Sequence, residues 1–298
     1  MSHAIRLTLT LILGLSTARA QSIAFTFDDG PRAEPGAVLD EKARNAALLG
    51  HLARHQVKSA LFLTLETFTP ERRPLVEAWG RAGHRIANHT ATHQSLESLS
   101  LEAFQADMQA CDRVIRTLPG FAPWFRFPYL KEGDTREKRD GFRAFLAAMQ
   151  YQPAGVSVDA SDWAYNQRLL ARLKRRPKAD LEPFRRAYLA HIWDRATYYD
   201  GLSRQVLGRS ASHVLLLHHN ELNAHFLGDL IQMFKARGWT VIDAEQAFGD
   251  PLYRMLPDTL PAGESLLWSL ARAKGTPGLR YPAEDDRYEK AAFRKAGI

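Results

Sequence analysis

The stretch Ile-Ala-Phe-Thr-Phe-Asp-Asp-Gly-Pro at residues 23–31 decides the fold. Its first five residues are apolar, aromatic or β-branched, as in a buried β-strand, and the Gly-Pro pair ends the strand in a turn. Asp28 and Asp29 stand between the strand and the turn. Two adjacent carboxylates at the mouth of a buried strand need water or a cation to stay ionised. The stretch therefore predicts a central strand whose carboxyl end takes part in chemistry.

Downstream of this strand, short apolar runs alternate with longer stretches of helical period, which favours an α/β architecture. Helices are expected between most of the strands. The number of strands favours a distorted, incomplete (β/α) barrel of about seven parallel strands over a doubly wound sheet. The predicted strands are 23–27, 59–64, 85–88, 124–127, 155–158, 214–217 and 240–242.

The first twenty residues have the features of a signal peptide. Arg6 precedes the apolar run 7–15, which is about half the ~20 residues that a membrane span needs. An Ala-Arg-Ala end predicts cleavage before Gln21, although an uncleaved anchor or an ordinary first helix is the alternative. We expect an exported protein, periplasmic or extracellular, with no membrane span after cleavage.

The remainder is expected to form one catalytic domain at residues 21–250 and an extension at 251–298 that packs on the barrel. A long insertion at 164–212 interrupts the alternation of strands and helices. Its basic and aromatic residues predict either solvated helices packed on the barrel or a lid that recognises glycans, and charge runs usually face water. The single cysteine, Cys111, cannot form an internal disulfide, so the fold depends on its core.

The charge of the chain is modestly positive. The formal net charge of +7 falls to +5 if Arg6 and Arg19 leave with the leader. Basic residues are spread along the chain and form no stripe with interleaved aromatics, so we expect no nucleic-acid partner. No feature indicates an obligate protein partner.

Clusters of chemically capable residues follow four more of the predicted strands. In a (β/α) barrel the carboxyl ends of the strands form the active-site face, so all the clusters are expected on one side of the molecule. His89 and His93 lie four residues apart, a spacing that directs two imidazoles to one point on a helical turn. The clusters are Asn-His-Thr-Ala-Thr-His at 88–93, Arg-Phe-Pro-Tyr at 126–129, Asp-Ala-Ser-Asp-Trp at 159–163 and Leu-Leu-Leu-His-His-Asn at 215–220.

In this order, the clusters resemble the motifs of the polysaccharide deacetylase family, the NodB-homology domain of carbohydrate esterase family 4. The resemblance covers about residues 22–245. His219 departs from the family pattern, because it stands where that pattern has an aspartate, and the insertion at 164–212 is a second departure. The resemblance implies a metal-dependent hydrolase that releases acetate from the N-acetyl groups of a peptidoglycan- or chitin-like polysaccharide or oligosaccharide.

The resemblance also implies a metal site and a base. Asp29, His89 and His93 would hold one divalent metal ion, zinc by preference with cobalt as a substitute. Asp28 would be the general base that takes a proton from the attacking water, and Arg126 would keep it ionised and oriented.

Other residues are assigned to the leaving group and the acetyl group on the same resemblance. His218 would protonate the departing amine, and Asp162 would orient it and raise its pKa. The backbone N–H of Tyr129 would meet the negative charge on the carbonyl oxygen. Substrate contacts are assigned to three apolar residues of these motifs: Pro128, Trp163 and Leu216.

Several alternatives stay open at this point. Trp163 and Leu216 are as well explained as core residues, and His219 as either structural or part of the site. Asp159 is expected in a turn or behind the residues that contact the substrate. The same metal site would serve an O-acetyl glycan esterase or a hydrolase of small amides. A catalytically silent glycan-binding module is a further alternative, against which the complete set of base, metal ligands and acid argues.

Overall fold

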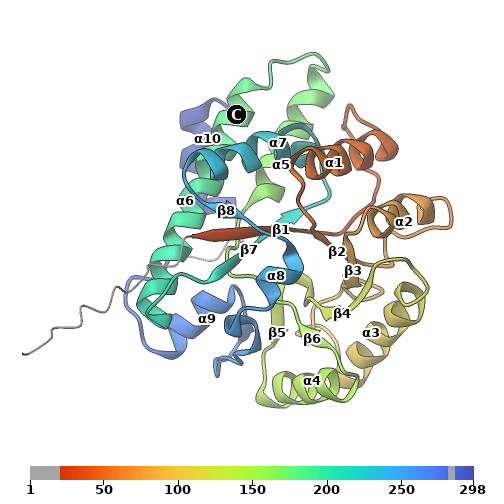
Figure 1. The fold of residues 1–298 in the computed structure, drawn as a ribbon, viewed down its shortest axis with the longest axis vertical. Coiled ribbons are helices and arrows are strands. Elements are labelled where there is room, and N and C mark those ends of the chain that lie inside the picture. Colours follow the sequence, from red (N-terminus) through yellow and green to blue (C-terminus); the bar gives the residue numbers. More distant parts are fainter. Residues whose placement is uncertain (1–20, 281–285) are drawn as a thin grey trace, which may run out of the picture.

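A curled parallel sheet forms the centre of the molecule. The computed structural model describes residues 21–280 and 286–298. Its seven strands lie in the order β6–β4–β3–β2–β1–β7, and β8 pairs with β1. Figure 1 shows the helices arranged around this sheet. The predicted signal peptide lies outside the described residues. The strands are β1 (Ser22–Asp28), β2 (Ala60–Leu63), β3 (Arg85–Asn88), β4 (Phe121–Phe125), β6 (Gln152–Pro153), β7 (Ser212–His218) and β8 (Thr240–Val241).

The incomplete (β/α) barrel predicted from the sequence is confirmed. All seven residues of β1 are buried, and β1 pairs with β7 along its whole length. Burial on both faces explains why this strand is apolar without alternation. The helices are α1 (Glu41–His55), α2 (Arg73–Arg81), α3 (Leu101–Ile115), α4 (Arg136–Ala148), α5 (Asp162–Arg175), α6 (Glu182–Leu207), α7 (Glu221–Ala236), α8 (Ala244–Phe248), α9 (Leu266–Ala273) and α10 (Lys290–Ala296).

The strand predicted at 155–158 is wrong in its bounds. The regular strand β6 comes earlier and pairs with β4, while further on a single bridge joins Val158 to Leu215 of β7. The bonds to β4 end with the Ala154 N–H, which donates to the Phe125 carbonyl over 2.7 Å. The chain then crosses to β7, where the Leu216 N–H donates to the Val158 carbonyl over 3.1 Å. This crossing segment partly closes the gap between β4 and β7. The strand β4 is also displaced, since it ends at Phe125, before Arg126.

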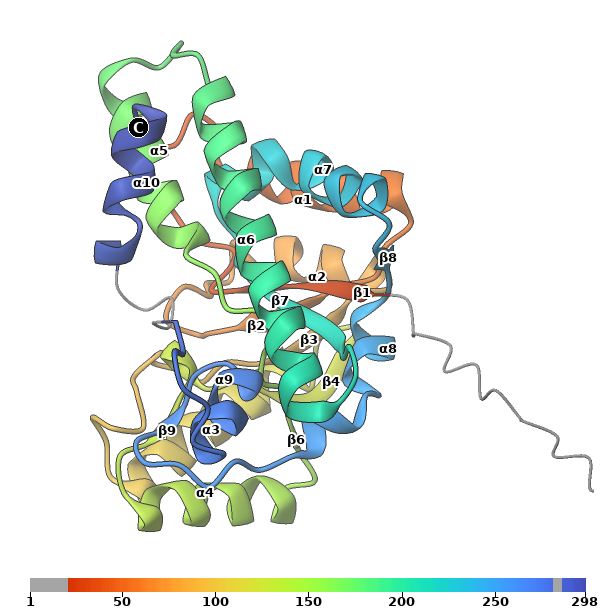
Figure 2. The same ribbon diagram turned by 90° about the vertical axis from the view of Figure 1, so that its left-hand side faces the viewer.

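The predicted insertion at 164–212 takes in α6 and all of α5 except its first two residues, and the chain after residue 250 adds α9, α10 and a short strand. Both insertion helices contact α7, and α9 contacts α6. The strand β9 (Ala262–Gly263) pairs antiparallel with β5 (Lys131–Gly133), apart from the main sheet. Figure 2 shows α10 beside α5 and α6. None of the helices in the described parts of the chain is long and apolar enough to cross a membrane.

Candidate active site

The carboxyl ends of β1, β3 and β7 surround one cavity of about 250 Å³. Asp28, the last residue of β1, is paired in register with His218, the last residue of β7. The parallel sheet therefore brings residues far apart in the sequence to one edge, as predicted. The cavity is lined by Asp28, Asp29, Arg32, His89, His93, Phe127, Tyr129, Leu130, Asp159, Ala160, Trp163, Leu216 and His218.

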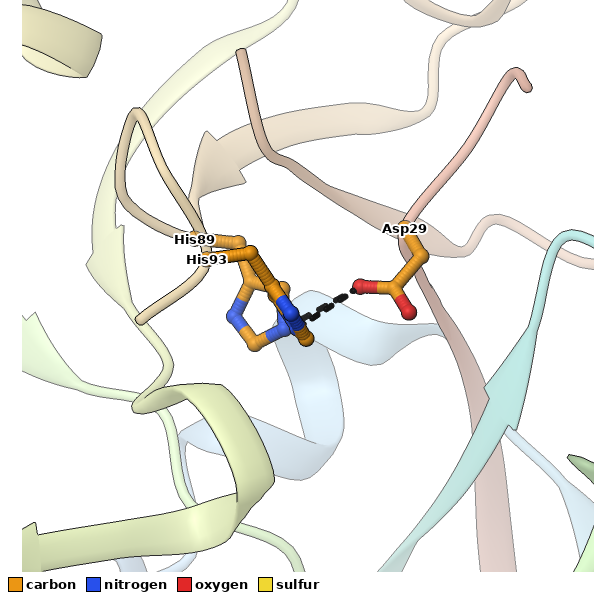
Figure 3. A group of neighbouring side chains, drawn as sticks. All are labelled: Asp29, His89 and His93. Atoms are coloured by element: carbon orange, nitrogen blue, oxygen red, sulfur yellow. Dashed lines mark ion pairs between the residues drawn. The ribbon is translucent and has the colours of Figure 1, made fainter. Parts of the chain in front are cut away.

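Asp29, His89 and His93 converge at this edge, and their ligand atoms lie within 4.8 Å of one another. Figure 3 shows both imidazoles directed at the Asp29 carboxylate. His93 Nε2 lies 3.1 Å and His89 Nε2 3.5 Å from Asp29 Oδ1. Nitrogen and oxygen ligands of a tetrahedral zinc ion are about 3.4 Å apart, because each lies roughly 2.1 Å from the metal. The spacing of the three side chains therefore fits a divalent metal ion.

The hydrogen bonds of this group support the same fit. His89 Nδ1 lies 2.9 Å from the Arg126 carbonyl, so Nδ1 carries the proton and Nε2 keeps a lone pair for a ligand. Asp29 Oδ1 is buried without a hydrogen bond. Burial alone would raise the pKa of Asp29, but the neighbouring His93, His218 and His89 hold it well below its usual range. The group therefore offers an anionic oxygen and an imidazole nitrogen in the form that a cation requires. Among the described residues, no other group of three or more such side chains comes together in this way.

The helical turn predicted for His89 and His93 is wrong, since both residues lie in an irregular loop after β3. The Asn88 side chain accepts from the Thr90 N–H over 2.9 Å, and Thr90 Oγ1 accepts from the His93 N–H over 3.0 Å. These side-chain hydrogen bonds fold the loop in place of a helical ladder. Five non-glycine residues around the cavity have left-handed backbones, which places strain at this rim. They are Asp29 (φ 66°), Thr90 (68°), His93 (55°), Tyr129 (57°) and Leu130 (56°).

Asp28 is held by a fully buried arginine. Arg126 Nη1 donates to Asp28 Oδ1 over 2.6 Å and to Thr26 Oγ1 over 2.9 Å. Arg126 Nε donates to the Ala154 carbonyl over 3.0 Å, and the guanidinium carbon lies 3.8 Å from the centre of the Phe62 ring. With its guanidinium bonded on two sides, Arg126 fixes both the charge environment and the orientation of the Asp28 carboxylate.

His218 forms a buried pair with Asp162. Its Nδ1 lies 2.7 Å from Asp162 Oδ1. The other carboxylate oxygen accepts from the His218 backbone N–H over 2.9 Å, from Asn220 Nδ2 over 3.0 Å and from Asn223 Nδ2 over 2.7 Å. Burial alone would lower the pKa of His218, but the charge and hydrogen bond of Asp162 raise it to about 10. The imidazole can therefore carry a proton at neutral pH.

The remaining predicted residues lie in different places. Trp163, Leu216 and Tyr129 line the cavity, and the Tyr129 ring lies 4.8 Å from the His93 ring. Pro128 is buried and does not line the cavity. Asp159 does line it, although it was expected in a turn or behind the residues that contact the substrate.

Sequence reasoning missed Arg32, Phe127, Leu130 and Ala160 as cavity residues. Arg32 Nη1 lies 3.5 Å from Asp29 Oδ2. The sequence signal that could have identified Arg32 is its position directly after the first cluster.

His219 does not line the cavity. It is buried, and its Nε2 lies 3.0 Å from Asn45 Oδ1. Burial lowers the pKa of His219 to about 3, so the imidazole is neutral. A Cβ added at Gly30 would overlap the His219 side chain, which shows that His219 packs directly under the turn after Asp29. His219 therefore has a structural role.

Comparison with known proteins gives matches to one family. Residues 16–145 match the family model described as polysaccharide deacetylase. The chain is 29% identical over 143 residues to a peptidoglycan-N-acetylglucosamine deacetylase of Bacillus cereus, covering 47% of this chain and 46% of that protein. It is 30% identical over 147 residues to a chitooligosaccharide deacetylase of Sinorhizobium fredii, covering 49% of this chain and 61% of that one. These matches span about half of the curated relatives.

Among solved structures, the chain resembles the catalytic domain of a peptidoglycan N-acetylglucosamine deacetylase from Eubacterium rectale. The TM-score is 0.52 and the identity 20%, over 75% of this chain and 88% of that one. At this identity the likeness shows a common fold, which agrees with the half-barrel described above.

Proposed function

Because this chain belongs to the polysaccharide deacetylase family, we propose that it hydrolyses the N-acetyl amide of an acetylated polysaccharide or oligosaccharide and releases acetate. The observation that carries this proposal is the meeting, in one cavity, of the Asp29–His89–His93 group with Asp28 and His218. A peptidoglycan- or chitin-like glycan is the proposed substrate. An exported protein, with residues 21–250 as its catalytic domain and 251–298 as an extension, would meet such a polymer in the periplasm or outside the cell.

Asp29, His89 and His93 would hold one divalent ion, and their oxygen and nitrogen donors favour zinc, with cobalt as a substitute. When bound, such an ion would polarise the acetamide carbonyl and make a neighbouring water more acidic. Asp28 adjoins this group in the chain and lies on the same cavity.

Asp28 would act as the general base. Arg126 donates to Asp28 Oδ1, so the other carboxylate oxygen, Oδ2, takes no hydrogen bond from the guanidinium. A proton from the attacking water would pass to this carboxylate, whose orientation the buried guanidinium fixes. The backbone N–H of Tyr129 would then stabilise the negative charge that develops on the carbonyl oxygen.

His218 would act as the general acid. An amine anion is a very poor leaving group, so cleavage of the amide needs a proton on the nitrogen as the bond breaks. The pKa of His218, raised to about 10, supports this role because the acid form persists at neutral pH. Trp163 and Leu216, which line the cavity, would contact the acetyl methyl group.

The test is release of acetate from a panel of acetylated glycans by residues 21–298 loaded with zinc. We expect N-deacetylation of at least one peptidoglycan- or chitin-like glycan, and none by an Asp28→Asn variant that still binds zinc. Glycan binding without acetate release would instead support a silent binding module, and cleavage of O-acetyl groups alone would support an esterase. Either result would overturn the proposal.

A further inference from the structure

A network of buried polar groups joins the end of the chain to the residue that precedes Asp162. Ser161 lies at the N-terminus of α5, and its backbone N–H donates to His191 Nε2 of α6 over 3.0 Å. A ring nitrogen that accepts this bond carries no proton, so the proton of a neutral His191 is on Nδ1. That atom lies 3.3 Å from Glu289 Oε2, just before α10. One imidazole therefore links the tail to the backbone beside Asp162.

Glu289 also accepts hydrogen bonds from two other side chains of the same region. The Ser161 hydroxyl donates to Glu289 Oε1 over 3.2 Å, and Arg195 Nη2 donates to the same oxygen over 2.7 Å. Burial alone would raise the pKa of Glu289, but hydrogen bonds and charges from His191 and Arg195 lower it to about 2, so the group is a carboxylate at neutral pH. The Ser161 side chain makes no capping bond to α5. A residue type that usually caps its own helix is here bonded to the tail.

Packing holds α10 in place for these bonds. The Phe293 ring lies 4.8 Å from the Tyr165 ring of α5, and the Tyr165 ring lies 4.7 Å from the His191 ring. Arg172 donates to the Gly297 carbonyl over 3.0 Å. Figure 2 shows α10 lying against the two insertion helices. The tail and the insertion, which are separate in the sequence, thus form one unit next to the active site.

We propose that Glu289 is a positioning residue for the His218–Asp162 pair. Glu289 orients the His191 ring through Nδ1, and His191 Nε2 accepts from the Ser161 backbone N–H. The position of Ser161 in turn fixes the start of α5, and with it the contact between Asp162 and His218 Nδ1. The inference rests on the proposed function for its catalytic consequence, but the placement of Asp162 can be measured without turnover. It assigns a part in the reaction to the C-terminal extension and to α6, although neither contributes a residue to the cavity lining.

The experiment compares three variants with the parent protein. All four proteins comprise residues 21–298 and are loaded with zinc. Glu289→Ala removes both acceptor oxygens, whereas Glu289→Gln keeps one, which can serve either His191 or Arg195 but not both. Asp194→Ala is the matched control, because it removes another bond between α6 and the tail, the 2.6 Å ion pair with Arg280, by the same truncation to alanine. Each protein is assayed for kcat and KM of acetate release, for melting temperature, and by NMR for the pH titration of the His218 ring.

We expect Glu289→Ala to lower kcat about tenfold, at the low end of what outer partners of functional groups contribute. KM should stay within about twofold, and the measured pKa of His218 should fall as its contact with Asp162 loosens. Glu289→Gln, which keeps one of the two acceptors, should lie between Glu289→Ala and the parent in kcat, and Asp194→Ala should match the parent. Parent values of kcat and of the His218 pKa in Glu289→Ala would overturn the proposal, as would an equal loss in Asp194→Ala.

Two safeguards keep the result decisive. If Glu289→Ala does not fold, His191→Leu and His191→Gln repeat the contrast, because a glutamine amide can both accept from Ser161 and donate to Glu289. If the parent releases no acetate from any glycan, the proposed function fails. The His218 titration then still decides the positioning role, so the two failures are distinguishable.

Discussion

Replacing Asp162 by asparagine should convert His218 from an acid into a neutral imidazole. Three donors, from His218, Asn220 and Asn223, hold one oxygen of the carboxylate. The amide oxygen of an asparagine would take that place, so its NH₂ would face His218 Nδ1 and donate to it. His218 would then carry its proton on Nε2 only, with burial still disfavouring a second proton.

The size of the effect follows from the pKa of His218. Against burial, which lowers it, that pKa is raised from 6.5 to about 10, first by Asp162 and then by the charges of Asp29 and Asp28. This difference corresponds to about 5 kcal/mol of interaction favouring the protonated ring. In the parent, the acid form is present at neutral pH and is lost as the pH rises through the raised pKa. In the variant we expect a pKa below 6.5, so the amide kcat should fall on the order of 10²- to 10⁴-fold at pH 7.

The assay compares an N-acetyl glycan with an aryl acetate ester across pH. The ester has a good leaving group that needs no proton, so its hydrolysis should change much less. Asp200→Asn is the matched control, because Asp200 also pairs with a buried histidine, His213 Nε2 at 3.3 Å, but does not line the cavity. Equal losses on amide and ester, or an unchanged pH profile of the amide kcat, would refute the acid role of His218.

Three further outcomes are expected. Asp28→Asn should lower amide turnover by about 10³-fold or more while zinc binding, measured by calorimetry, stays near the parent value; normal turnover would contradict the assignment of the base. Removal of metal by a chelator should abolish turnover and lower the melting temperature, and zinc or cobalt should restore both, whereas Asp29→Ala should show no such response. His219→Ala should cost about 2–4 kcal/mol of unfolding free energy in denaturant titrations, because it removes the bond to Asn45 and the packing under Gly30, with kcat per folded molecule affected much less than by Asp28→Asn.

The sequence predicted those parts of the molecule that depend on local pattern. The strands β1 and β7 are buried along their length, so their apolar runs were easy to recognise in the sequence. Polar residues that directly follow parallel strands must all lie at one edge of the sheet. Asp28 and His218 were therefore expected near each other, and the register of the two strands pairs them.

What the sequence could not predict depends on long-range partners and loop geometry. The loop of His89 and His93 is shaped by side-chain hydrogen bonds of Asn88 and Thr90, which periodicity does not describe. Glu289 lies in the tail, and nothing in its local pattern indicates that it meets Ser161 across 128 residues. The structural place of His219 likewise depends on Asn45, a residue of α1 far away in the chain.

The left-handed backbone at the cavity rim limits which amino acids could replace its residues. Each such non-glycine residue costs on the order of 1–3 kcal/mol, which the surrounding fold must outweigh. Substituting a β-branched residue for Asp29, His93, Tyr129 or Leu130 would therefore destabilise the backbone, in addition to any loss of the original side chain's chemistry. Efforts to redirect substrate preference should begin instead at Arg32 and Trp163, cavity residues whose backbones are outside this left-handed set.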